Sequence, residues 1–381
     1  MLKTQTNLLT KSKKGEKMLF ENNRYDQKVY DEELRDFLPD KIIDIHTHVW
    51  KDENRVKVGT DAIRSVTWTD LVAKDNPIED LQETYRIMFP DKKVKALIFG
   101  TMSQDALSLK LGNDYVKESA EKAGYDALYY STPRESAEEI EKNIKEDGFL
   151  GLKSYLDLSD PIIPSDEIRV YDFFPPHQLE VVNDLGGIIM LHLPRSKRFA
   201  DPCNLFDIKN ISERYKNLKL IVAHIGRAYT PKDMRGVAEY LKGSKNFMVD
   251  FSANTCEYAM EEALKTFGAE RLMFGSDLPI LRMRMRRIEE NGTYISLVPP
   301  KMYGDLTNEP HMREVSEEET KTLTYFMYEE IRAMKQAVTK LGLGKNSVEN
   351  MFYNNAANLL ETVKGNVYGK QVSHDGKRKT F

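Results

Sequence analysis

The sequence predicts an α/β protein of the (β/α)8 type, a TIM barrel formed by a single domain. Three observations lead to this prediction. Short apolar runs recur along the chain, the segments between them have helical character, and eight such strand–helix units follow one another. Near-continuous apolar runs are typical of strands buried on both faces, as in a parallel sheet covered by helices. Eight units on one chain favour a closed barrel over an open sheet.

The predicted strands are short runs of β-branched and aliphatic residues. In chain order they cover residues 41–49, 94–100, 125–133, 149–156, 186–194, 218–226, 246–253 and 271–279. Helix signals separate them. A Ser-x-x-Glu capping box at Ser136 opens a helix that Gly148 ends. A second capping box at Ser316 predicts a long amphipathic helix that continues to about Leu341.

The predicted barrel covers residues 41–363. We expect residues 1–40 to form an extension that is partly disordered and then helical, and residues 364–381 to form a polar tail. Two long loops exceed what a minimal barrel needs, one after strand 1 (residues 50–78) and one after strand 8 (residues 279–315). Both follow strands and therefore lie on the C-terminal face, where barrel active sites are built. Long loops at such places are often functional.

Composition excludes several classes of function. With 40% hydrophobic and 30% charged residues, the chain has the mix of a globular protein with a large core. A net charge of -4 provides no strong attraction to nucleic acid or to an anionic membrane. No run approaches the roughly 18 apolar residues that a membrane-spanning helix needs. Cys203 and Cys256 are too few for a disulfide framework or a cysteine metal site. We therefore expect a cytoplasmic protein without nucleic-acid or membrane partners.

Polar residues at the ends of four predicted strands single out one end of the barrel. His46 and His48 are spaced by two, so both side chains point to the same face of strand 1. His192, His224 and Asp277 end strands 5, 6 and 8. A single histidine near a core is usually a hydrogen-bonded structural residue, but burying five such groups without a shared partner costs several kcal/mol. A metal ion offsets that cost, because imidazole and carboxylate bind divalent zinc, iron or manganese.

This set of residues resembles the amidohydrolase superfamily, most closely its amidohydrolase-2 branch, which includes decarboxylases related to aminocarboxymuconate-semialdehyde decarboxylase. The matching pieces are DIHTH (44–48), MLHLP (190–194), VAHIG (222–226), FGSDLP (274–279) and MFYNNAANLL (351–360). They occur in the order expected for that branch and span about residues 41–362. The resemblance supports the barrel prediction over nearly the whole folded part of the chain.

The resemblance also implies a division of roles within the site. His46, His48, His192 and Asp277 would hold one divalent metal ion, with zinc expected and manganese or iron as alternatives. His224 would stand beside the ion as a catalytic residue rather than a permanent ligand. A homodimer is expected by resemblance alone.

Two further acidic residues are expected to lie next to the predicted metal ligands, on the side away from the metal ion. Asp250, near the end of strand 7, is predicted to accept a hydrogen bond from a metal-binding histidine, because such ligands commonly need a partner. Asp44 is in phase with the two histidines of strand 1 and is predicted to point inward one layer deeper.

The predicted chemistry is hydrolysis of an ester, lactone or amide. A divalent ion with an open position lowers the pKa of bound water from about 16 to about 7. Asp277 is placed to take a proton from the water and return it to the leaving group, and His224 to stabilise negative charge on the substrate. The same residues could instead handle the proton that replaces carbon dioxide in a non-oxidative decarboxylase. From another class, the ion could be structural and the barrel non-catalytic.

Cations near the predicted mouth of the barrel indicate a small anionic substrate, such as a sugar acid or lactone, because guanidinium groups bind carboxylate or phosphate. Arg195 and Arg227 lie just past the histidines of strands 5 and 6. Arg282 and Arg284 belong to an Arg-Met run after strand 8, for which a solvated or subunit-contact surface is the alternative. Lys153 on strand 4 could bind a substrate carboxylate, pair with a nearby acid or, if carboxylated, bridge two metal ions. The first two roles are preferred, because members of the branch that this chain resembles usually bind a single metal ion.

Overall fold

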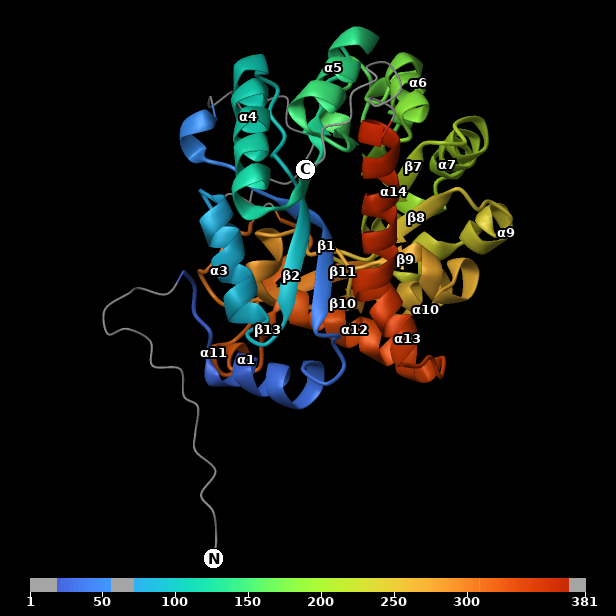
Figure 1. Ribbon diagram of the computed structural model, residues 1–381. Coiled ribbons are helices and arrows are strands. Elements are labelled where there is room, and N and C mark those ends of the chain that lie inside the picture. The colour runs from blue at the N-terminus through green and yellow to red at the C-terminus, as the bar shows by residue number, and fades with distance from the viewer. Residues whose placement is uncertain (1–18, 56–71, 308, 370–381) are drawn as a thin grey trace, which may run out of the picture.

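Parallel strands arranged as a (β/α)8 barrel form the centre of the molecule, and helices surround them (Figure 1). The computed structural model describes residues 19–55, 72–307 and 309–369. Within these residues all eight predicted barrel strands are present, and the third is split by one residue into two pieces. The strands are β1 (Lys41–His48), β2 (Lys93–Phe99), β3 (Asp126–Ala127) with β4 (Tyr129–Tyr130), β5 (Gly151–Lys153), β6 (Ile188–Leu191), β7 (Lys219–Val222), β8 (Phe247–Asp250) and β9 (Leu272–Met273).

Hydrogen bonds join these strands into a closed ring. Two arcs of neighbouring parallel strands run in the orders β1-β2-β3 and β4-β5-β6-β7-β8-β9. Leu128 joins the arcs on one side, because its N–H donates to the carbonyl of Ile98 at 3.0 Å between the two halves of the third strand. On the other side the N–H of Asp277 donates to the carbonyl of His46 at 2.7 Å. A parallel bridge between Thr47 and Leu278 continues this junction, so the end of the last strand lies against the end of the first.

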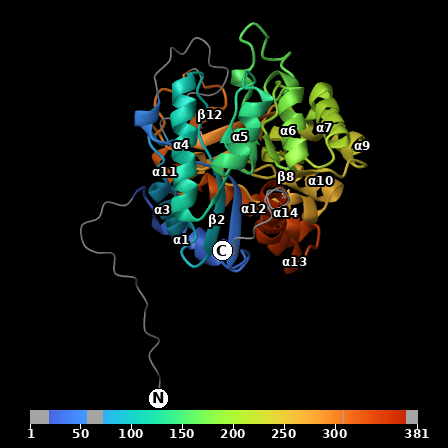
Figure 2. The same cartoon turned by 45° about the horizontal axis from the view of Figure 1, so that its top comes forward.

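Helices cover the outside of the barrel, and Figures 1 and 2 show α4, α5, α6 and α7 following one another around it. The strand side chains beneath them are apolar and buried; all four residues of β6 are 0% exposed. The capping box predicted at Ser136 is present, and Gly148 with φ 83° ends that helix. The larger helices of this layer are α3 (Ile78–Met88), α4 (Ala106–Ala123), α5 (Ala137–Asp147), α6 (Pro176–Leu185), α7 (Pro202–Arg214), α9 (Val237–Leu241), α10 (Glu257–Phe267) and α12 (Phe326–Lys340).

The last helix lies across the N-terminal ends of several strands. It is α14 (Asn355–Gly369), and it follows α13 (Lys345–Glu349) and a π-helical turn (Asn350–Asn354). The Lys364 ammonium lies 2.9 Å from the carboxylate of Asp126 at the start of β3, and the hydroxyl of Tyr368 donates to the carbonyl of Phe149 at 3.4 Å, just before β5. The predicted tail boundary at residue 364 therefore falls inside a helix.

At the other end of the chain, α1 (Arg24–Val29) and a π-helical turn (Tyr30–Leu34) precede β1, as predicted for the second half of the extension. The predicted disordered start at residues 1–18, the end of the tail at 370–381 and part of the loop after β1 (56–71) lie outside the described residues. Among the helices that the structure describes, none combines the length and the apolar character needed to cross a membrane.

The segment after β9 was predicted as one long loop, and this is wrong. It contains a hairpin of β10 (Arg284–Glu290) and β11 (Thr293–Val298), and β12 (Met312–Glu314) and β13 (Thr324–Tyr325) complete a four-stranded sheet in the order β12-β11-β10-β13. The hairpin turns at Asn291-Gly292, both with positive φ (51° and 70°). An Asn-Gly pair between two strands is the strongest local hairpin signal, and it was present in the sequence.

The predicted long helix after Ser316 is also wrong in its extent. Its capping box is present, but the helix it opens, α11 (Glu317–Thr320), ends after four residues. The chain then pairs with β10, opposite Arg284 and Met285, before α12 begins. Those sheet hydrogen bonds use the backbone groups that a continuous helix would need, so tertiary pairing overrides the local helix signal.

Candidate metal centre and active site

Two histidines of β1 and one aspartate after β9 lie together at the C-terminal end of the barrel. The Nε2 atoms of His48 and His46 are 3.2 Å and 3.7 Å from Oδ1 of Asp277. One ligand atom from each of the three residues lies within 4.8 Å of the other two. Ligands about 2 Å from a tetrahedral ion lie roughly 3.3 Å apart, so this arrangement suits one divalent ion.

Hydrogen bonds fix which nitrogen of each histidine faces the centre. Nδ1 of His46 lies 2.9 Å from Oδ2 of Asp250, and Nδ1 of His48 lies 2.7 Å from the carbonyl oxygen of Gly100. Because both partners only accept hydrogen bonds, each Nδ1 carries the proton and each Nε2 presents a lone pair toward Asp277. This is the tautomer that a metal ligand needs.

Asp250 organises the back of the site. It is fully buried, and the hydrogen bond predicted from the sequence is present at His46. Its second oxygen accepts from the backbone N–H of His224 at 2.9 Å and from the hydroxyl of Ser252 at 2.5 Å. Burial acts to raise the pKa of Asp250, but the interaction with His46 and these hydrogen bonds hold it below its usual range. The carboxylate therefore stays ionised and fixes two histidines at once.

His224 stands beside the three-residue centre. Its ring centroid is 4.7 Å from that of His46 and 5.3 Å from that of His192. Nδ1 of His224 lies 2.8 Å from the hydroxyl of Ser252. Burial lowers the pKa of His224 to about 4, so the free imidazole is neutral at pH 7. The Ser252 hydroxyl donates to Asp250 and so accepts from Nδ1 of His224, which leaves a lone pair at Nε2 where the neutral ring can accept a proton.

The backbone around His224 is strained. The short element α8 (His224–Arg227) has positive φ at all four residues, 60°, 48°, 58° and 63°. Left-handed conformation costs an L-residue about 1–2 kcal/mol. Such strain persists where the surroundings demand it, and it is common at functional sites. Here the turn carries both a candidate catalytic histidine and the adjacent Arg227.

His192 lies next to this centre but outside the group of three. It is buried (8% exposed), and within the part of the chain that the structure describes its Nδ1 has no hydrogen-bond partner. Its Nε2 faces the hydroxyl of Tyr155 at 3.4 Å. Burial holds the pKa of His192 well below its usual value, and the charge of Arg227 acts in the same direction. A buried, unpartnered ring nitrogen indicates a ligand position beside the centre.

Tyr155 was not singled out from the sequence. Its ring centroid is 4.5 Å from that of His192, and burial raises the pKa of its hydroxyl, so the group stays protonated. It lies two residues beyond Lys153, in phase with it on the strand-4 segment. That spacing was the available signal, but a tyrosine in an apolar run is ordinary packing material in most barrels.

Lys153 is nearly fully buried (2% exposed) at the end of β5. Its ammonium lies 5.3 Å from the ring centroid of Phe99, and no described carboxylate forms an ion pair with it. Burial lowers the pKa of Lys153 to about 8, although the charges of Asp277 and Asp250 oppose that change. The Lys153 ammonium can therefore donate hydrogen bonds to an anionic group of a ligand bound at the centre.

The four predicted substrate-binding arginines separate into two pairs. Arg227 lies beside His192, and its Nη1 donates to the carbonyl of Leu193 at 2.9 Å. Arg195 belongs to the same edge, but its Nε donates to the carboxylate of Asp201 at 2.9 Å. This pair borders the histidines, as the sequence predicted for their position after strands 5 and 6.

The other pair has structural partners instead. Arg284 is buried (5% exposed), and its two terminal nitrogens donate to the two carboxylate oxygens of Asp26 in α1 at 2.8 Å and 2.6 Å. Arg282 donates to Asn76 at 2.5 Å and to the carbonyl of Asp80 at 3.2 Å. The contacts of Arg284 and of Nη2 of Arg282 therefore join parts of the fold, while the buried Nε of Arg282 has no hydrogen-bond partner among the described residues.

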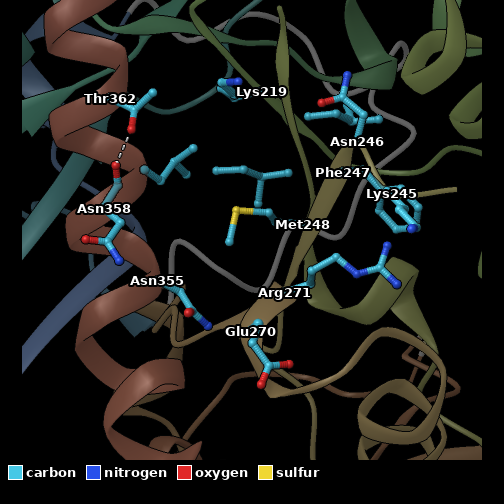
Figure 3. Close-up of a pocket in the computed structure, with 13 residues that line it drawn as sticks. Lys219, Lys245, Asn246, Phe247, Met248, Glu270, Arg271, Asn355, Asn358 and Thr362 are labelled. Carbon is cyan, nitrogen blue, oxygen red and sulfur yellow. Dashed lines mark hydrogen bonds between the residues drawn. The ribbon is translucent and has the colours of Figure 1, made fainter. Parts of the chain in front are cut away.

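A separate surface pocket of about 380 Å³ lies at the N-terminal ends of β7, β8 and β9, away from the strand ends that carry the histidines. Figure 3 shows Asn355 and Asn358 of α14 on one side of it and Lys245 and Arg271 on the other. Arg271 donates to the carbonyls of Phe267, Ser244 and Thr266, so its guanidinium is used in holding the fold. The pocket has none of the features of the histidine centre and is not the candidate active site.

A (β/α)8 barrel with histidines and an aspartate at the C-terminal strand ends is the architecture of metal-dependent barrel enzymes. The family model with the description Amidohydrolase matches residues 43–361. The chain therefore belongs to the amidohydrolase-2 family, as the sequence motifs indicated. A search of curated proteins finds no match.

Solved structures of the same fold are similar to this chain. An amidohydrolase from Burkholderia multivorans with bound zinc is 14% identical, with a TM-score of 0.53 over 84% of this chain and 99% of that one. A 5-carboxyvanillate decarboxylase from Novosphingobium aromaticivorans, in complex with manganese and 4-hydroxy-3-methoxy-5-nitrobenzoic acid, is 14% identical, with a TM-score of 0.51 over 85% and 96% of the two chains. A probable 2-pyrone-4,6-dicarboxylic acid hydrolase from Acinetobacter baumannii is 14% identical, with a TM-score of 0.50 over 84% and 99%. At these identities the likeness establishes the fold, and the reactions of these proteins differ.

Proposed function

We propose that the protein is a metal-dependent hydrolase that cleaves an ester, lactone or amide bond of a small anionic molecule. One observation carries the proposal: the Nε2 atoms of His46 and His48 converge on Asp277 while hydrogen bonds hold the opposite side of each ring. Holding two imidazole lone pairs close to a carboxylate is unfavourable without a cation, and simple packing of the core would not require it. The same arrangement of side chains is what a metal site needs.

The residues present fit a divalent ion. His46, His48 and Asp277 offer two imidazoles and a carboxylate, a donor set that zinc, manganese and iron accept. His192, with its unpartnered buried Nδ1, is proposed as the fourth ligand. When bound, the ion supplies Lewis acidity, which acidifies water and polarises a carbonyl group. A second group of three is His46, His224 and Asp250. It is not proposed as a site, because Asp250 already accepts hydrogen bonds from Nδ1 of His46 and from the backbone N–H of His224.

The side chains around this centre can carry the proton transfers of hydrolysis. The pKa of Asp277 is lowered to about 2: burial acts to raise it, and the contacts with His48 and the other neighbouring histidines outweigh burial. The carboxylate is therefore ionised at pH 7 and can accept a proton from water and pass it to the leaving group. Once its Nε2 has accepted a proton, His224 lies where it can stabilise a substrate oxygen that gains negative charge.

The anionic part of the substrate is proposed to bind to Lys153, Arg227 and Arg195. Arg227 and Lys153 both lie near enough to His192 for their charges to lower its pKa. Arg284 is left out of this proposal because both of its terminal nitrogens are bound to Asp26, and Arg282 is left out because its Nη2 is held by Asn76 and by the carbonyl of Asp80.

The runner-up function is a non-oxidative decarboxylase, in which the same cations would hold a carboxylate and Asp277 or His224 would deliver the replacing proton. Its support is that solved proteins of this fold include a decarboxylase as well as a hydrolase, so the fold permits either reaction. A structural metal in a non-catalytic barrel is the third reading. A homodimer and a cytoplasmic location stay predictions.

One set of experiments separates these readings. The purified protein, loaded with zinc or manganese, is screened against lactones, esters, amides and aromatic carboxylates, and both acid release and carbon dioxide release are measured. We expect acid release that Asp277→Asn abolishes while the variant stays folded by circular dichroism. Asp114→Asn, at an exposed ion pair on α4, is the control that keeps full activity. Release of carbon dioxide establishes the decarboxylase instead, and full activity of Asp277→Asn contradicts the assigned role.

A further inference from the structure

Asp44 places a buried carboxyl group at the junction between the first and the last barrel strands. The residue is 0% exposed and lies on β1, two positions before His46. Its two oxygens each accept two hydrogen bonds, from two backbone N–H groups and two hydroxyl groups. A carboxylate has about four acceptor sites, so protein donors already saturate this group. Asp44 is therefore neither a metal ligand nor a contact for substrate.

The four donors come from both sides of the junction. Oδ1 of Asp44 accepts from the N–H of His46 at 3.1 Å and from the N–H of Ser276 at 2.9 Å. Oδ2 accepts from the hydroxyl of Ser276 and, at 2.6 Å, from the hydroxyl of Tyr85 in α3. Asp44 thus binds directly to one proposed metal ligand, His46, and to the residue that precedes another, Asp277.

The Ser276 hydroxyl extends this support around Asp277. It donates to Asp44 and accepts from the N–H of Leu278 at 3.1 Å, so the residues on either side of Asp277 are tied to the same carboxyl group. The φ of Asp277 is 49°, a conformation that L-residues rarely adopt. Such a backbone persists only where its surroundings hold it, and here the Ser276 hydroxyl closes the turn.

The chain that carries this turn lies directly against β1. A Cβ added to Gly275 would lie 2.7 Å from Cβ of His46. The N–H of Asp277 donates to the carbonyl of His46 at 2.7 Å, and the N–H of His48 donates to the carbonyl of Leu278 at 3.0 Å. With the two backbones joined in this way, the conformation of the turn determines where the Asp277 carboxylate stands relative to the two imidazoles.

We propose that Asp44 and Ser276 are positioning residues for Asp277, and that they hold its carboxylate at the place where Nε2 of His46 and His48 converge. This inference rests on the proposed role of Asp277 as a metal ligand and deepens it, because it names the groups that set the geometry of the ligand. Tyr85 supports Asp44 from the side of α3, and in the described chain its hydroxyl bonds to Asp44 and to no residue of the turn.

The test compares Ser276→Ala with Tyr85→Phe. Each variant removes one buried hydroxyl from the same oxygen of Asp44, and only Ser276→Ala also removes the acceptor of the Leu278 N–H. Zinc affinity is measured by competition with a chelator, and the stability of the metal-free proteins by urea denaturation. We expect both variants to lose stability, the zinc Kd of Ser276→Ala to rise by about 10- to 100-fold, and that of Tyr85→Phe to stay within about twofold.

Cobalt(II) bound in place of zinc gives a second readout, because its visible absorption depends on the number and arrangement of its ligands. We expect this spectrum to change in Ser276→Ala and to stay the same in Tyr85→Phe. A spectrum of Ser276→Ala identical to that of the wild type overturns the proposal, whatever its zinc affinity. An equal loss of affinity in the two variants also overturns it, because both hydroxyls then act only through the stability of the fold.

Neither measurement depends on turnover. A failure to find hydrolysis therefore refutes the proposed reaction and leaves the roles of Asp44 and Ser276 to be decided by the zinc affinities and the cobalt spectra. A wild-type protein that binds no zinc at these residues overturns the proposed metal site and this inference together.

Discussion

Replacing Lys153 by methionine should stabilise the protein at neutral pH. Lys153 is only 2% exposed, and burial lowers its pKa from 10.5 to about 8. At about 1.4 kcal/mol for each pKa unit, the buried ammonium destabilises the folded state by about 3 kcal/mol wherever the amine is charged in both states. Methionine fills a similar volume without the charge, so it should recover most of that free energy below pH 8.

The pH dependence of the free energy of unfolding tests directly whether the charged Lys153 destabilises the folded protein. As the pH rises through about 8, the folded protein releases the Lys153 proton before the unfolded chain does, so the stability of the wild type rises between pH 8 and 10.5. The advantage of Lys153→Met should shrink from about 3 kcal/mol at pH 7 to about 1 kcal/mol at pH 9.5. Urea denaturation of both proteins at the two pH values, with the same metal loading, measures it.

Two outcomes would refute the reasoning about Lys153. A variant less stable than the wild type at pH 7 would mean that the ammonium has a partner in the folded protein. An advantage of equal size at both pH values would mean that its charge is not desolvated. Lys142→Met, at an exposed position of α5, is the control and should leave the free energy of unfolding unchanged at both pH values. If Lys153 also binds the anionic part of the substrate, Lys153→Met should raise KM.

Two further predictions concern the supports of the site and of the inserted sheet. Asp250→Asn should weaken metal binding by about 10- to 100-fold, measured by competition with a chelator, because the Nδ1 proton of His46 loses its anionic acceptor; unchanged affinity would exclude this support. Arg284→Met should lower the free energy of unfolding by about 3–5 kcal/mol without changing metal content, because it leaves the carboxylate of Asp26 buried and unpaired. Arg313→Met, which breaks an exposed ion pair with Glu290 on the same sheet, is its matched control; equal losses in the two variants would contradict the explanation.

The convergence of His46, His48 and Asp277 could be predicted from the sequence because its signals are local. The spacing of His46 and His48 follows from the two-residue period of a strand, and the strand-end positions of His224 and Asp277 follow from the apolar runs before them. The barrel then determines that these ends meet, since parallel strands place their carboxyl ends at one face. Once the barrel fold is assumed, the meeting of these side chains follows without any further information on long-range contacts.

The supporting contacts could not be predicted in this way. Arg284 was predicted to bind substrate, and its actual partner, Asp26, lies 258 positions earlier in an extension outside the barrel. Glu330 occupies a charged position in an amphipathic helix, and only the folded structure shows that it is buried. Tertiary contacts of this kind leave no periodicity in the sequence. The Asn291-Gly292 hairpin is different, because the Asn-Gly pair is a local signal that the sequence contains.

The most direct test of the account is a crystal structure of the metal-loaded protein with anomalous diffraction measured at the absorption edge of the bound metal. The account predicts one strong anomalous peak per chain, about 2 Å from Nε2 of His46, Nε2 of His48 and a carboxylate oxygen of Asp277. It predicts that this peak disappears in Asp277→Asn grown under the same conditions. A peak that lies elsewhere in the molecule, or no peak between these three residues at full metal loading, would contradict the central claim.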